Sequence, residues 1–133
     1  MEHKMNDKRL CSIRGAACSE NTAESITDSV GKLCRLMFSG NKLSEDDIVN
    51  IQFTVTPDLD ALNPATALRR CGNTGLDTSV IPLFCSQEPV IRGMLPKVIR
   101  IMITAYVPEG FKRKSEYING AEILRPDLAG IKA

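Results

Sequence analysis

The sequence predicts a single α+β domain in which helices cover one face of a mixed β-sheet. Its length of 133 residues is that of one domain. Strand-like and helix-like segments follow one another irregularly, with about five strands and two main helices, which is typical of α+β proteins. The main helix has a single apolar stripe, as expected for a helix that lies on a sheet. The second face of such a sheet is not covered by helices of the same chain. If that face is apolar, a chain of this size is expected to form an oligomer.

The first two expected elements are a strand over residues 9–18 and the main helix over residues 21–41. Asn21 is a favourable N-cap residue, and Glu24 follows three positions later, as in a capping box. Gly40 is a C-terminal stop signal. The apolar residues that recur at helical spacing are Ile26, Val30, Leu33, Cys34 and Met37.

The middle of the chain predicts a short helix, a strand and a compact helix. Ser44 is followed by acidic residues, which favour a helix N-terminus. Residues 49–55 alternate between apolar and polar side chains, which indicates a strand. In the compact helix over residues 62–72, Asn63 is the N-cap and Pro64 takes the first helical position.

The last third of the chain predicts three further strands. Residues 79–85 form the first, and Pro82 within it indicates a sheet edge or a bulge. Residues 98–107 form a long apolar strand, and residues 115–124 form the last one before the tail.

Arg100 lies inside the long apolar strand and needs an explanation. Alternation places it on one strand face with Val98, Met102, Thr104 and Tyr106, while apolar residues alone occupy the other face. Because a buried guanidinium is costly unless an anion meets it, we expect either a protein carboxylate or a ligand there. The structural alternative is an ion pair or a head group that reaches water.

Six other residues are candidates for the same kind of site. Arg14 ends an otherwise small and apolar strand segment, and Glu88 follows the strand that contains Cys85. Glu88 is a candidate catalytic carboxylate, a solvated loop residue or the structural partner of Arg100. The Cys85 thiol and the Tyr117 hydroxyl either contact a ligand or pack against the protein. Arg69 and Arg125 are also candidates. The alternative for each is a solvent-exposed arginine without a ligand, on a helix face for Arg69 and in the tail for Arg125.

Composition excludes several classes of function. The net charge of +1 does not indicate nucleic acid or an anionic membrane as partner. The chain has no run of 18 apolar residues and no signal-peptide pattern. Its five cysteines are scattered without a CxxC, which argues against a metal site and fits a reducing cytoplasm. The only histidine, His3, lies near the start. The remaining set suits binding of a small anion, with any catalysis coming from positioning and electrostatics.

Five segments together resemble the AroH-class chorismate mutases. They are IRGA at 13–16, TVTPDLDALNPATALR at 54–69, CSQE at 85–88, VIRIMI at 98–103 and EYINGAEILRPDL at 116–128. The paired motifs C-x-Q-E and R-x-x-x-T, with Glu88 and Arg100 twelve residues apart, are specific in combination. The resemblance covers residues 10–128, which we expect to form the domain. Residues 1–9 are expected to be a flexible extension, and residues 129–133 a tail that is poorly ordered without ligand.

The resemblance implies an isomerase that rearranges chorismate to prephenate in phenylalanine and tyrosine biosynthesis, without cofactor or metal. It implies a homotrimeric pseudo-α/β-barrel with active sites between subunits. Arg100 would meet the ether oxygen, Arg14 a carboxylate of the substrate, and Glu88 the ring hydroxyl. Further substrate-binding positions would be Cys85, Tyr117, Arg69, Leu124, Arg125, Ala65 and Thr66.

Two alternatives stay open from the sequence. One is a RidA-like enamine/imine deaminase, since these trimers also bind a carboxylate with a strand arginine. The other is a non-catalytic trimer that binds a small anion. The chain departs from the family pattern at Asn63 and Thr66, where relatives carry Phe and often Lys. The apolar wall of the cleft and one positive charge would therefore differ here.

Overall fold

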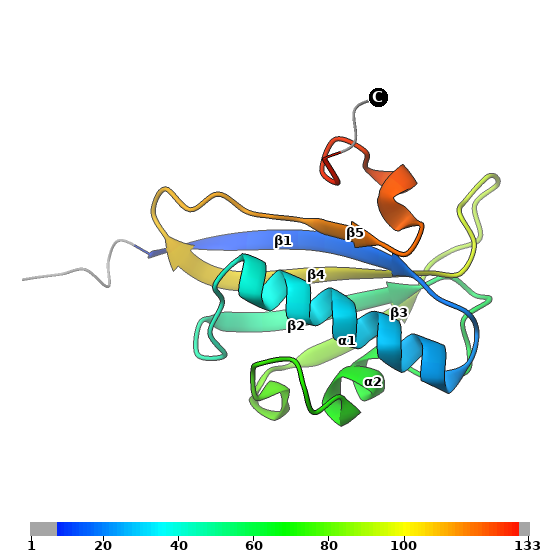
Figure 1. The fold of residues 1–133 in the computed structure, drawn as a ribbon, viewed down its shortest axis with the longest axis horizontal. Coiled ribbons are helices and arrows are strands. Elements are labelled where there is room, and N and C mark those ends of the chain that lie inside the picture. The colour runs from blue at the N-terminus through cyan, green and yellow to red at the C-terminus, as the bar shows by residue number, and fades with distance from the viewer. Residues whose placement is uncertain (1–7, 131–133) are drawn as a thin grey trace, which may run out of the picture.

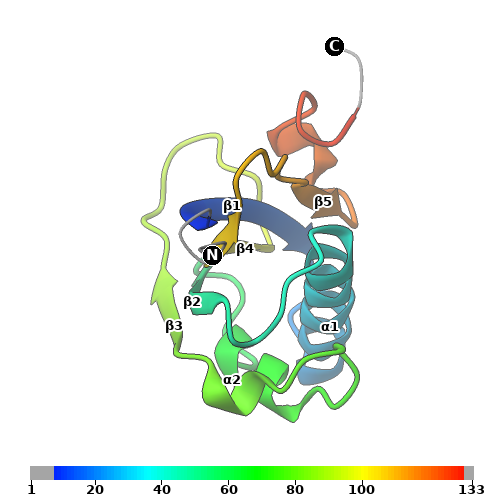
Figure 2. The same cartoon turned by 90° about the vertical axis from the view of Figure 1, so that its left-hand side faces the viewer.

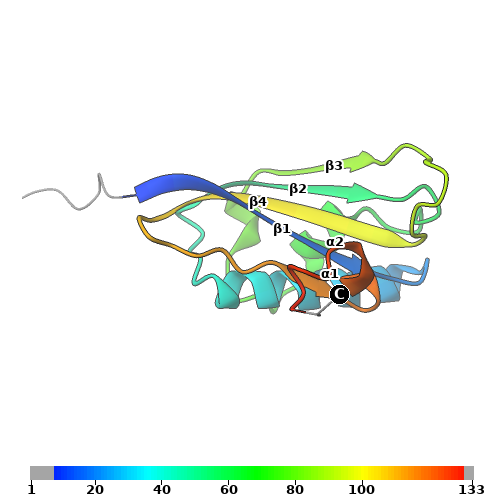
Figure 3. The same ribbon diagram turned by 90° about the horizontal axis from the view of Figure 1, so that it is seen from above.

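A five-stranded mixed sheet with two α-helices on one face forms the described part of the chain, residues 8–130 of a computed structural model (Figure 1). The strand order is β3-β2-β4-β1-β5. Figures 2 and 3 show both helices on the same side of the sheet. The predicted α+β architecture is confirmed. The elements are β1 (Lys8–Cys18), α1 (Ala23–Gly40), β2 (Ile48–Val55), α2 (Pro64–Arg70), β3 (Leu83–Gln87), β4 (Val98–Pro108) and β5 (Glu116–Ile118), with short 3-10 helices η2 (Thr78–Val80) and η3 (Ala121–Leu124).

β4 is the central strand, and its alternation decides which face of the sheet is covered. It pairs antiparallel with β1 from Val98–Cys18 to Pro108–Lys8, and antiparallel with β2 on its other side. The predicted division of its side chains is confirmed: Ile99, Ile101 and Ile103 are buried under the helices. Arg100 and its same-face neighbours line the opposite side, which we call the open face.

The core lies between α1, α2 and the covered face of the sheet. Its largest fully buried side chains come from both layers and include Ile13, Leu33, Met37, Phe53 and Ile99. Gly15 allows α1 and β5 to approach β1 closely. A Cβ atom at this position would lie 2.7 Å from the Glu116 carbonyl oxygen and 2.8 Å from the Met37 sulfur.

The ends of α1 differ in part from the prediction. Thr22, not Asn21, is the N-cap, and its side chain accepts a hydrogen bond from the Ser25 backbone N–H. The Asn21 side chain instead accepts from the backbone N–H groups of Asp60 and Ala61, so it joins the helix start to the loop after β2. The helix ends at Gly40, as the sequence predicted.

Three other expectations were wrong in detail. The segment after Ser44 is a turn rather than a helix, and the Ser44 hydroxyl hydrogen-bonds Asp47 3.1 Å away. The strand expected at 79–85 begins only at Leu83, because Asp77 caps the 3-10 helix η2 just before it. Its edge position is confirmed. The last strand is three residues long, since Gly120 adopts a left-handed conformation and begins η3.

The start of the domain lies earlier than expected. β1 begins at Lys8, one residue before the strand expected at 9–18 and inside the segment expected to be a flexible extension. Lys8 forms an ion pair with Asp47 at 2.8 Å. Residues 1–7 and 131–133 lie outside the described part, and the expected disorder of the tail after Leu128 falls mostly on them. Within residues 8–130, no helix has the length and apolar character needed to cross a membrane.

Candidate active site

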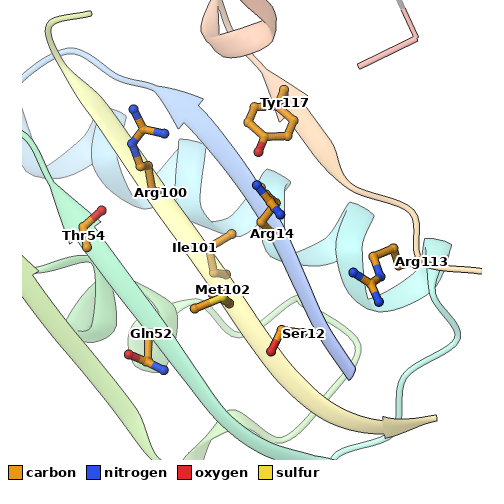
Figure 4. A pocket seen from close by; sticks show the side chains of 10 residues that line it. Ser12, Arg14, Gln52, Thr54, Arg100, Ile101, Met102, Arg113 and Tyr117 are labelled. Atoms are coloured by element: carbon orange, nitrogen blue, oxygen red, sulfur yellow. The ribbon is translucent and has the colours of Figure 1, made fainter. Parts of the chain in front are cut away.

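A cavity of about 360 Å³ lies on the open face, over β1, β2 and β4 (Figure 4). Three strands contribute basic or hydroxyl side chains to its lining: Arg14 comes from β1, Arg100 from β4 and Tyr117 from β5. Gln52 and Thr54 line it from β2. We call this cavity the pocket.

Strand register explains why these side chains meet. Thr54 and Ala16 are the direct neighbours of Arg100 on β2 and β1, and Tyr117 is the neighbour of Ala16 on β5. Ala16 is fully buried in this row. It packs in the same small cluster as Tyr117, so this row joins Arg100 to the tyrosine. Met102, in the adjacent row, has Gln52 and Arg14 beside it.

Arg100 has a carboxylate partner within the same chain. Its Nε atom lies 2.8 Å from Glu88 Oε2, and the Thr54 hydroxyl donates a hydrogen bond to the same oxygen. The Glu88 backbone N–H donates to the Val55 carbonyl, which fixes the residue at the end of β3. The Arg100 side chain is 45% exposed, so the expected burial of this guanidinium was wrong for the single chain. The anion that meets it in this chain is the carboxylate of Glu88.

The ion pair leaves most of the guanidinium available. The closest contact of Glu88 is with Nε, and no carboxylate among residues 8–130 accepts a hydrogen bond from the two terminal amino groups of Arg100. An arginine has five N–H donors in a rigid fork, so four of them lie on those terminal groups. The pair therefore holds Arg100 in place without using its outer donors.

Tyr117 is buried and close to several charges. It packs in a small cluster with Ala16, Val98 and Ala121. Burial raises the pKa of its hydroxyl, and the positive charges of Arg14, Arg125 and Arg100, in that order, lower the pKa by less. The hydroxyl therefore stays protonated at neutral pH and is available as a hydrogen-bond donor.

Four predicted site residues lie away from the pocket. Cys85 pairs in register with Phe53 and packs against the core, so its side chain points to the helix-covered side. Burial raises the pKa of its thiol. The other three are on α2: Ala65 is buried, Thr66 half-buried and Arg69 exposed in the last turn. We call Ala65, Thr66, Arg69 and Cys85 the α2–β3 group. A single chain does not bring it to the pocket.

The two predicted tail residues lie at the rim. Leu124 packs against the cluster that contains Tyr117. Arg125 is engaged by Asp127, with its Nη2 atom 2.8 Å from Oδ2 and its Nε atom 3.1 Å from Oδ1. Its charge still reaches Tyr117, where it lowers the pKa of the hydroxyl.

Apart from Ile101, which alternation places on the opposite face of β4, sequence reasoning missed five side chains of the pocket. Strand alternation could have predicted four of them. Ser12 lies two residues before Arg14 and therefore on the same face of β1, and Gln52 and Thr54 share the polar face of β2. The fourth is Met102, which the sequence placed on the same face of the strand as Arg100 but did not indicate as a site residue. Arg113 gave no signal, since it lies in the connection between β4 and β5.

A family model described as chorismate mutase type I matches residues 10–128 of the chain. The chain belongs to this family. The chorismate mutase AroH of Bacillus subtilis (strain 168) is 33% identical over 120 residues, which cover 88% of this chain and 91% of the relative. The enzyme of the same name from Thermus thermophilus is 34% identical over 119 residues, or 87% and 93% of the two chains. A solved structure, chorismate mutase from Clostridium thermocellum, has a TM-score of 0.72 and 39% identity, with 85% of this chain and 98% of that one covered.

The resemblance seen in the sequence is thereby confirmed. As a type I chorismate mutase the chain is an isomerase that converts chorismate to prephenate, a step of aromatic amino acid biosynthesis. The deaminase and non-catalytic alternatives are set aside.

Proposed function

We propose that this chorismate mutase rearranges its substrate in the pocket on the open face, with Arg100, Glu88 and Arg14 as the catalytic residues. The observation that carries the proposal is the convergence of Arg14, Arg100 and Tyr117 from three strands on one cavity. All three side chains present N–H or O–H donors, which suit a dicarboxylate. The volume of about 360 Å³ lies in the range of small-molecule sites.

The reaction asks for positioning and charge stabilisation only. The ether C–O bond of chorismate breaks while a C–C bond forms in the same molecule, so no proton, electron or group passes to the protein. Negative charge develops on the ether oxygen as its bond to carbon breaks. The outer donors of Arg100 would stabilise that charge, because Glu88 and Thr54 hold the side chain before the reaction begins.

Glu88 and Arg14 would orient the two ends of the substrate. Glu88 binds Arg100 and Thr54 through Oε2, and Oε1 accepts no hydrogen bond from residues 8–130. We assign Oε1 to the ring hydroxyl of chorismate. Arg14 and the protonated hydroxyl of Tyr117 would together bind one carboxylate.

The complete site is proposed to form in a homotrimer. The open face exposes large apolar side chains: Leu10 is 54% exposed, Phe84 65%, Met102 41% and Tyr106 49%. Exposure of this kind favours contact with another copy. The α2–β3 group lies away from the pocket of its own chain, so it would complete the pocket of a neighbour, with Leu124 and Arg125 at the mouth. Sedimentation should then show one species near three times 14.6 kDa, and a monomer would contradict the trimer.

A cytoplasmic location is part of the same proposal. Cys11, Cys18, Cys34, Cys71 and Cys85 are all free thiols. Free thiols persist in a reducing compartment.

The test of the pocket is the fall of chorismate absorbance with wild type and with Arg100→Ala, each verified as the same oligomer. Prephenate should form rapidly with wild type, and the variant should lose at least ~10²-fold in kcat, the scale for one donor to a developing oxyanion. Wild-type turnover by Arg100→Ala would place the chemistry elsewhere.

A further inference from the structure

Arg113 is the one pocket residue that comes from a loop of the described chain rather than a strand (Figure 4). It lies in the basic connection between β4 and β5, between Lys112 and Lys114. The Lys114 ammonium is engaged by Glu116, 3.6 Å away. No carboxylate of residues 8–130 lies within 4.0 Å of the Arg113 guanidinium, although its side chain borders the same cavity as Arg14.

The backbone beside Arg113 is held by a buried side chain. Asn41, the C-cap residue of α1, is 4% exposed. Its amide donates to the Lys114 carbonyl at 2.9 Å, and its side-chain oxygen accepts from the Lys114 N–H at 2.7 Å. The amide also donates to Met37 at the end of α1. This clamp ties the loop to α1 one residue after Arg113, so the guanidinium is presented from an anchored backbone.

The pocket has an excess of two positive charges, which two anionic groups of a ligand would balance. Arg14, Arg100 and Arg113 bring three positive charges, and the Glu88 carboxylate neutralises one of them through its ion pair with Arg100. Chorismate is a dicarboxylate. Within one chain, the two pocket guanidinium groups that form no ion pair with a carboxylate of residues 8–130, those of Arg14 and Arg113, match the two carboxylates of the substrate.

We propose that Arg113 is a further substrate-binding residue that binds the second carboxylate of chorismate, and that Asn41 positions it. The proposal rests on the pocket being the substrate site. Arg14 and Tyr117 hold the first carboxylate. Both carboxylates keep their charge through the rearrangement, so Arg113 binds ground state and transition state equally. Loss of such an interaction raises KM and leaves kcat unchanged.

The test compares Arg113→Gln with Lys112→Gln in steady-state kinetics with chorismate. Both variants remove one positive charge from the same exposed loop, but Lys112 does not line the pocket. We expect Arg113→Gln to raise KM roughly tenfold, the effect of losing a charge-assisted hydrogen bond, with kcat unchanged. Lys112→Gln should keep both constants. Arg113→Lys should recover part of the affinity, because it restores the charge without the fork. Equal KM values for the two glutamine variants would overturn the proposal.

A double-mutant cycle tests the clamp. Asn41→Ala should raise KM in the wild-type background and add nothing in the Arg113→Gln background, since the residues act through one contact. An equal rise in both backgrounds would remove Asn41 from the proposal. If the pocket is not the substrate site, the result is a different one, because Arg100→Ala would then keep wild-type turnover. Loss of turnover in Arg100→Ala, with no KM change in Arg113→Gln, would overturn the role of Arg113 alone.

Discussion

Replacing Arg100 with lysine separates the charge of this residue from its geometry. The Nε atom of Arg100 is used by Glu88 at 2.8 Å, while the terminal amino groups are left for the substrate. Lysine has a single ammonium group, which cannot occupy both positions. It will pair with the Glu88 carboxylate, which is only 17% exposed, because an unpaired and largely buried carboxylate is costly. The transition state then loses its donor at the ether oxygen.

We expect Arg100→Lys to lower kcat by about 10²–10³-fold, or about 2.7–4 kcal/mol, as for other donors to a developing oxyanion. Stability should hardly change, since a pair with one partner 45% exposed contributes about 0–1 kcal/mol. The assay is chorismate consumption at saturation, with thermal unfolding measured on the same samples. Arg92→Lys, an exposed arginine in the loop before β4 that does not line the pocket, is the matched control. Wild-type kcat in Arg100→Lys would refute the reasoning, because charge alone would then suffice.

Three further predictions concern neighbouring residues. Gly15→Ala should destabilise the fold by roughly 1–3 kcal/mol, seen as a lower Tm, because the new Cβ meets backbone at 2.7 Å; an unchanged Tm would contradict the close packing there. Thr54→Val should lower kcat about tenfold, since Glu88 loses a hydrogen bond worth about 1 kcal/mol or more; a rate equal to wild type would show that Arg100 needs no such support. Tyr117 has a raised pKa, so its contribution to stability is complete below the unfolded value of about 10 and is lost as the pH rises beyond it. Tyr117→Phe should therefore unfold less readily than wild type above that pH, in alkaline denaturation curves, and identical curves would contradict the raised pKa.

The local elements were predictable because their signals are local. The alternation in β4 placed the isoleucines on one face and Arg100 on the other, since successive side chains of a strand point to opposite sides. Asn63 and Pro64 marked the start of α2 through the geometry of a helix N-terminus. The errors arose where local signals compete, as at Asn21, whose side chain bonds the loop after β2 and leaves the cap to Thr22.

The sequence by itself therefore determined the main strands and helices, the family and the candidates Arg14, Arg100 and Tyr117 of the pocket. Only the tertiary structure decided which of these residues meet. Register set Thr54 and Ala16 beside Arg100, and the end of β3 supplied Glu88 as its partner. The loop held by Asn41 added Arg113, which no pattern indicated. The physical reason is that periodicity and capping act over a few residues, whereas strand order and loop anchoring join residues far apart in the chain.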